Sequence, residues 1–147
     1  MTGSLYETDF YAWATEQAAL LRAGKLSAAD VEHIAEEIES MGRSEKRELV
    51  SRLRVLLHHL LKWQHQPSRR GNSWRLSIAN ARDELDTHLR DNPSLKAVLD
   101  QAVADAYRLA RRDAAAETGL TEATFPSECP YGFTQMMDEG FWPGEQS

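Results

Sequence analysis

Residues 44–75 read SEKRELVSRLRVLLHHLLKWQHQPSRRGNSWR, and this stretch decides the fold class. Its apolar side chains recur three and four positions apart, which is the spacing of one face of an amphipathic α-helix. Pro67 disfavours helical backbone at the residue before it, so the helix is predicted to end near Gln66. At 1.5 Å per residue such a helix is about 30 Å long.

The loop PSRRGN follows, and Asn72 or Ser73 is suited to cap a next helix. The stretch is therefore a helix–loop–helix corner. Trp63 and Trp74 bracket this corner, so both are predicted to be at least partly buried.

Outward from this corner, capping residues and helix-ending glycines predict helices along almost the whole chain, and no strand pattern is present. The fold class is predicted to be all-α, a five-helix and mostly antiparallel bundle. An irregular C-terminal segment that contains one short helix is expected to pack back on it. The other main helices are expected within residues 8–24, 27–42, 72–91 and 94–119, and the short one near residues 132–138.

Length and composition fit one helical domain over residues 1–147, with frayed ends at about 1–5 and 144–147. Hydrophobic residues make up 41% of the chain, which is too many for a disordered protein. No segment has the length and apolarity of a membrane span or an export signal. A single cysteine, Cys129, fits a reducing compartment. These observations predict a cytoplasmic protein that does not associate with membranes.

Charge is distributed unevenly along the chain. Residues 43–82 carry ten basic and two acidic side chains, whereas the segments on both sides are strongly acidic. Ten cations over forty residues could neutralise several phosphates, and tryptophans beside arginines could stack on unpaired bases. The basic segment 43–82 is thus a candidate surface for nucleic acid or phosphate. The candidate anion-binding residues are Lys62, Arg69, Arg70 and Arg75.

Internal pairing is the alternative for the same basic segment. The acidic helix expected within residues 27–42 precedes the basic helix by a short connection, which usually makes neighbouring helices antiparallel. In that arrangement Glu32, Glu36 and Glu39 would face Arg47 and Arg54. The acidic net charge of the whole chain, −6, also argues against a dedicated nucleic-acid binder.

Histidines and carboxylates also allow a metal hypothesis. His33 and Glu37 are four positions apart and share a helix face. If the next helix lay beside them, His59 could complete a divalent metal site for a metal-dependent hydrolase. His88 is a further candidate on the following helix. Neither the Glu-x-x-His pairs of di-iron bundles nor a His-Glu-x-x-His motif is present, and no motif for nucleophilic catalysis appears.

Several long motifs together resemble a bacterial family known as domain of unknown function twenty-nine. The resemblance rests on YETDFYAWATEQAALLRAG, IAEEIESMGRSEKRELVSRL, HLLKWQHQP, ARRDAAAETGL and TFPSECPYGFTQMMDEGFWP, and it extends from about Tyr6 to Pro143. It implies an all-helical bacterial protein of one domain. It does not indicate an activity, and it identifies no catalytic residues.

No catalytic motif emerges, so the leading prediction is a small, non-catalytic interaction module that binds a protein partner or a second copy of itself. Nucleic-acid binding and metal-dependent hydrolysis are the two alternatives.

Overall fold

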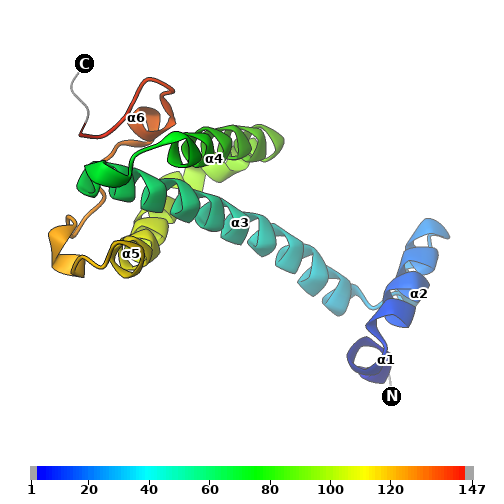
Figure 1. Cartoon of the computed structure of the whole chain (residues 1–147). Coiled ribbons are helices and arrows are strands. Elements are labelled where there is room, and N and C mark those ends of the chain that lie inside the picture. The colour runs from blue at the N-terminus through cyan, green and yellow to red at the C-terminus, as the bar shows by residue number, and fades with distance from the viewer. Residues whose placement is uncertain (1–2, 145–147) are drawn as a thin grey trace. The chain divides into compact units, whose positions relative to one another are not determined.

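The computed structural model describes residues 3–144, and within them the chain is helical with no strand (Figure 1). Short 3₁₀ turns connect most of the α-helices. The all-α prediction is therefore confirmed. The α-helices are α1 (Gly3–Thr8), α2 (Phe10–Arg22), α3 (Val31–His65), α4 (Asn72–Asp91), α5 (Leu99–Thr118) and α6 (Phe133–Met137). None of the described helices is long and apolar enough to cross a membrane.

The chain divides into two compact units, Met1–Ser44 and Glu45–Ser147. Helix α3 begins in the first unit and continues into the second. The expectation of one domain over residues 1–147 stays a prediction. The part of the expected frayed ends at residues 1–2 and 145–147 lies outside the described residues.

In the first unit, an aromatic cluster joins α1, α2 and the beginning of α3. The rings of Tyr6 and His33 stack with centroids 3.9 Å apart, and the ring of Trp13 meets Tyr6 edge-on at 4.7 Å. Trp13 and Gln17 are the buried side chains of α2. Asp9 caps this helix by accepting a hydrogen bond from the backbone N–H of Ala12. The unit therefore has a small core made mainly of aromatic rings.

The core of the second unit lies among the C-terminal half of α3, α4 and α5. Leucines at helical spacing on α3 are fully buried there, and alanines of α5 allow close helix approach. Hydrogen bonds pair Arg52 with Glu84 and His88 with Glu45, so α4 runs antiparallel to α3. The buried α3 residues are Leu49, Leu53, Leu56, Leu57, Leu60, Leu61, Lys62 and Trp63.

The C-terminal segment packs on this core, as predicted. Phe125, Tyr131 and Met136 are buried, and Trp142 packs against the ring of Trp63 with centroids 4.8 Å apart. Trp63 is fully buried and Trp74 is half-buried, as expected for the two sides of the α3–α4 corner.

The predicted helix boundary at Gly42 is wrong. Separate helices were expected within residues 27–42 and 44–66, but α3 passes through Gly42 without a break. A glycine inside a helix costs only about 1 kcal/mol relative to alanine, and helix-forming residues on both sides outweigh it. Gly24 and Gly119, in contrast, follow helix ends with φ of 74° and 77°, as a helix-ending glycine should.

Candidate functional site

A groove on the second unit is lined by residues of α3 and α4 and has a volume of about 570 Å³. Five of its nine lining residues are carboxylates, and one is a histidine. Its walls are Glu45, Glu48, Arg52, Asp83, Glu84, Thr87, His88, Asp91 and Asn92. An acidic groove of this kind favours a cation over an anion.

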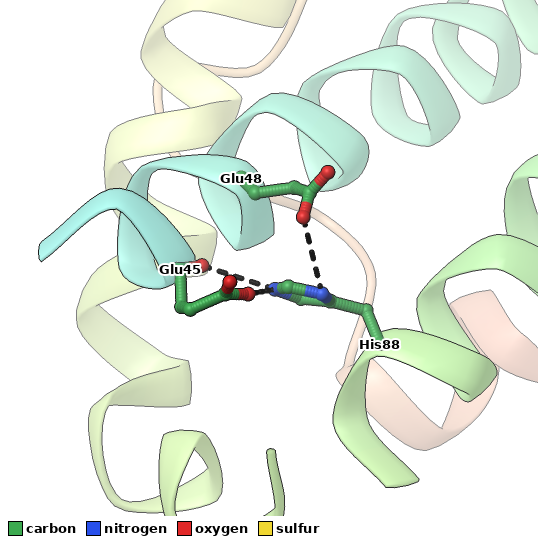
Figure 2. A group of neighbouring side chains, drawn as sticks. All are labelled: Glu45, Glu48 and His88. Carbon is green, nitrogen blue, oxygen red and sulfur yellow. Dashed lines mark hydrogen bonds and ion pairs between the residues drawn. The ribbon is translucent and has the colours of Figure 1, made fainter. Parts of the chain in front are cut away.

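Within this groove, His88 of α4 lies between two glutamates of α3 (Figure 2). Its Nε2 is 3.0 Å from the backbone oxygen of Glu45 and 3.7 Å from a carboxylate oxygen of the same residue. Its Nδ1 is 3.4 Å from Oε2 of Glu48. One ligand atom from each residue lies within 4.8 Å of the others. The imidazole is 7% exposed, so the surrounding helices hold its position.

Arg52 orients Glu48 within the groove. It lies one turn further along α3, donates to Oε1 of Glu48 at 3.1 Å and donates to Glu84 of α4 at 2.8 Å. The second oxygen of Glu48, Oε2, is the atom directed at His88. One carboxylate oxygen of Glu48 is therefore held by Arg52, and the other faces the imidazole of His88.

A second polar cluster, in the first unit, is centred on Asp30. Its carboxylate accepts hydrogen bonds from Trp13 Nε1 at 3.1 Å and from His33, whose Nδ1 is 2.7 Å away. Its backbone N–H donates to Gln17 at 2.7 Å. The hydrogen bond from His33 is the main reason that the pKa of Asp30 is lowered. Because Asp30 also accepts from the backbone N–H of His33, it acts as a capping residue at the start of α3.

A family model matches residues 5–142, and its description is domain of unknown function DUF29. The match extends over almost the whole chain. The chain belongs to the DUF29 family. No curated protein and no solved structure gave a match.

In this DUF29 protein, three of the four predicted anion-binding residues contact the protein itself. Lys62 is buried, donates to Glu117 of α5 at 3.2 Å, and lies over the ring of Trp74. Arg70 donates to the backbone oxygen of Trp63 at 2.6 Å. Arg75 lies over the rings of Trp63 and Trp142. Arg69 is exposed on the α3–α4 connection.

Two further arginines of the basic segment also bind within the second unit. Arg54 makes a two-pronged contact with Asp113 of α5, with Nη2–Oδ1 at 2.8 Å, and this contact lowers the pKa of the carboxyl. Arg82 is 4% exposed and donates to the backbone oxygens of Met136 and Phe141 at 2.8 and 2.7 Å. The basic segment thus binds α5 and the C-terminal segment.

The internal pairing that the sequence suggested has different partners in the structure. Residues 32–39 and Arg47 belong to one helix, so the acidic and basic parts are not antiparallel neighbours. Near this junction, Arg43 pairs with Glu36 at 3.5 Å, and both side chains are more than half exposed.

The premise of the predicted metal set was also incorrect, because His33, Glu37 and His59 all lie on α3 rather than on two neighbouring helices. His33 contacts Asp30, and Glu37 accepts a hydrogen bond from Tyr6 that raises the pKa of the phenol to about 12. His59 is hydrogen-bonded to the backbone oxygen of Val55 at 2.9 Å.

The three histidines near the C-terminal end of α3 are half-buried. Burial lowers the pKa of His58, His59 and His65. The ring of His65 meets Phe125 edge-on at 4.8 Å, and its Nε2 is buried without a hydrogen-bond partner among the described residues.

The sequence did not predict the grouping of His88 with the other residues of this groove. His88 had been noted as an isolated candidate, but its partners depend on the antiparallel pairing of α3 with α4. The signal available in the sequence was the spacing of Glu45 and Glu48, which places two carboxylates one turn apart on a helix.

Proposed function

We propose that this protein is a small non-catalytic interaction module of the cytoplasm, and that residues 10–41 bind a partner protein. The proposal depends mainly on where large apolar side chains are exposed. Among the described residues, seven of the nine exposed large apolar side chains fall in the first unit. They are Phe10, Tyr11, Leu21, Leu26, Val31, Ile38 and Met41.

Exposed apolar residues that occur singly are ordinary, but a group on one face indicates an interaction surface. On α3, Val31, Ile38 and Met41 fall within about 80° of one another at 3.6 residues per turn. Ile38 and Met41 are 58% and 61% exposed. This apolar stripe is narrower than a core-facing helix surface and resembles the seam that one helix of a coiled coil presents to another.

The charge beside the stripe favours a particular partner. Glu32, Glu36 and Glu39 are exposed beside it, and residues 1–42 carry eight acidic and two basic side chains. Like charges across an interface are costly, whereas opposite charges accelerate encounter and favour correct pairing. The partner that fits is therefore a helix whose apolar face has basic residues along its edges.

A cytoplasmic location agrees with the state of Cys129. This residue is a free, half-buried thiol, and burial raises its pKa. A thiol of this kind is mainly protonated at neutral pH and reacts slowly with oxidants.

The proposal is tested with the double substitution Ile38→Glu and Met41→Glu in the full chain. Both positions are exposed, so helical content and unfolding midpoint should stay close to those of the unmodified protein. Affinity-tagged protein recovered from its native cells should then lose a stoichiometric partner that the unmodified protein retains. Sedimentation velocity of the purified protein shows whether that partner is a second copy of the same chain or a different protein.

Leu76→Glu provides the matched control, because Leu76 is 62% exposed and lies on α4 of the second unit. The control should keep the partner. Identical recovery by the double variant and the unmodified protein, or equal loss in the control, would contradict the proposal.

A further inference from the structure

The contacts of His88 determine which of its ring nitrogens carries a proton. The backbone oxygen of Glu45 accepts hydrogen bonds and cannot donate, and it is 3.0 Å from Nε2. Nε2 therefore bears the hydrogen. The other ring nitrogen, Nδ1, is 3.4 Å from Oε2 of Glu48, a carboxylate oxygen that can share either a proton or a metal ion with it.

The separation between His88 and Glu48 matches that of two ligands on one metal ion. Nδ1 and Oε2 are separated by 3.4 Å. Two ligands bound to a tetrahedral metal at about 2.0 Å are about 3.3 Å apart, so this separation already fits a metal ion. One ligand atom from each of the three residues lies within 4.8 Å of the others. The carboxylate of Glu45 is half exposed and lies 3.7 Å from Nε2, so its side chain would have to turn toward Nδ1 to complete the set.

We propose that Glu45, Glu48 and His88 form a binding site for a divalent first-row transition-metal ion such as Zn²⁺. Nδ1 of His88 and one oxygen from each glutamate are the three protein ligands. The ion would lie in the α3–α4 groove, and the remaining coordination positions would face water. Figure 2 shows the three proposed ligands.

The groups around these ligands match those of known metal sites. Metal-binding histidines usually donate their second ring N–H to a carbonyl or carboxylate, as His88 does to Glu45. Ligating carboxylates are usually held by a further hydrogen bond, and Arg52 supplies one to Glu48 at 3.1 Å. Asn92 makes a longer contact of 3.4 Å with Oε2 of Glu45.

The ligand chemistry selects the class of ion. One imidazole and two carboxylates suit borderline cations such as Zn²⁺ better than Ca²⁺ or Mg²⁺, which prefer oxygen ligands alone. The groove carries Asp83, Glu84 and Asp91 in addition to the two ligating glutamates, so its potential attracts any divalent cation. Selectivity for Zn²⁺ over Mg²⁺ therefore depends on His88.

The test is isothermal titration of the untagged, metal-free full chain with Zn²⁺ near pH 7.5, with Mg²⁺ titrated separately. One Zn²⁺ per chain should bind, and Mg²⁺ should bind at least tenfold more weakly. Substituting Glu48→Gln or Glu45→Gln should weaken Zn²⁺ binding by at least about tenfold, because even loss of an outer-shell partner costs ten- to a hundredfold. Far-UV circular dichroism of each variant checks that the helices persist.

Asp83→Asn is the matched control, because it removes one negative charge from the same groove without removing a ligand. It should change Zn²⁺ affinity by less than threefold. The proposal is overturned if Zn²⁺ does not bind, if both glutamine variants bind as tightly as the unmodified protein, or if Asp83→Asn weakens binding as much as they do. The last result would mean that the groove attracts cations by charge alone.

Discussion

Replacing Arg82 with methionine should detach the C-terminal segment from the second unit. The guanidinium donates to the backbone oxygens of Met136 and Phe141 and lies over the ring of Trp142, with 5.3 Å to the centroid. Methionine has similar length and no donor, so both carbonyls would lose their partner. The substitution therefore isolates the contribution of the buried charge and its hydrogen bonds.

The magnitude follows from three contributions. Hydrogen bonds to a charged group contribute about 1.5–3 kcal/mol each, and the contact with Trp142 about 0.5–2 kcal/mol. Burial of the guanidinium opposes them, and this burial lowers the pKa of Arg82. Removing a buried charge recovers a desolvation cost of several kcal/mol, so the net loss of stability should be about 2–4 kcal/mol.

The assay is urea unfolding followed by tryptophan fluorescence and by circular dichroism. Arg90→Met is the control on the same helix, because Arg90 is 73% exposed and pairs only with Asp86 among the contacts described for it. An exposed pair of this type contributes about 0–1 kcal/mol. If Arg82→Met and Arg90→Met changed the unfolding free energy equally, the structural role assigned to Arg82 would be wrong.

Three other outcomes are expected. His65→Phe should raise the unfolding free energy by about 1 kcal/mol in urea titrations, because it removes a buried nitrogen without a partner and keeps the ring contact with Phe125; a loss of stability would contradict this. Stability should fall between pH 7.5 and pH 5.5, since the lowered pKa values of His58, His59 and His65 mean that the unfolded chain binds more protons below about pH 6.5. Urea titrations at both pH values check this, and an increase in stability at the lower pH would oppose it. Arg69→Ala should change any affinity for single-stranded nucleic acid by less than threefold, because the neighbouring cations contact the protein itself. Binding measurements at several salt concentrations check this, and a large loss of affinity with a reduced salt slope would restore the nucleic-acid hypothesis.

Local patterns predicted most of the helices. The spacing of apolar residues and the glycines at positions 24 and 119 indicated α2, α4 and α5. The start of α5 was placed at residue 94, whereas residues 93–98 form a 3₁₀ helix and α5 begins at Leu99, and α1 was not predicted. The helix end predicted at Gly42 was wrong because a glycine can end a helix or remain inside one. The choice depends on whether the residues on both sides propagate the helix, and residues 31–65 contain no proline to stop it.

The candidate metal site was less predictable than the fold. His33, Glu37 and His59 were grouped on the assumption that a connection separated two helices, and the continuous α3 removes that connection. His88 meets Glu45 because α4 returns antiparallel along α3, a relation between residues more than forty positions apart. Local spacing indicates which residues share a helix face, but the pairing of two faces depends on packing in the core.

The sequence predicted only part of the structure of the helix–loop–helix corner at residues 58–75. Its role as a helix–loop–helix connection and the burial of Trp63 are confirmed. Lys62 was a candidate anion-binding residue, yet it is buried beside Trp74 with Glu117 as its partner. A lysine can be buried when its long apolar stem packs in the core and its ammonium group reaches a carboxylate at the edge.

The central claim is that the exposed apolar stripe of α3 binds a protein partner, and site-specific photo-crosslinking in living cells tests it most directly. A photoreactive phenylalanine analogue would replace Ile38 in one strain and Leu76 in another, because both side chains are exposed and apolar. The account predicts a discrete crosslinked product from position 38 and none of the same mass from position 76. No discrete product from position 38, or the same product from both positions, would contradict it.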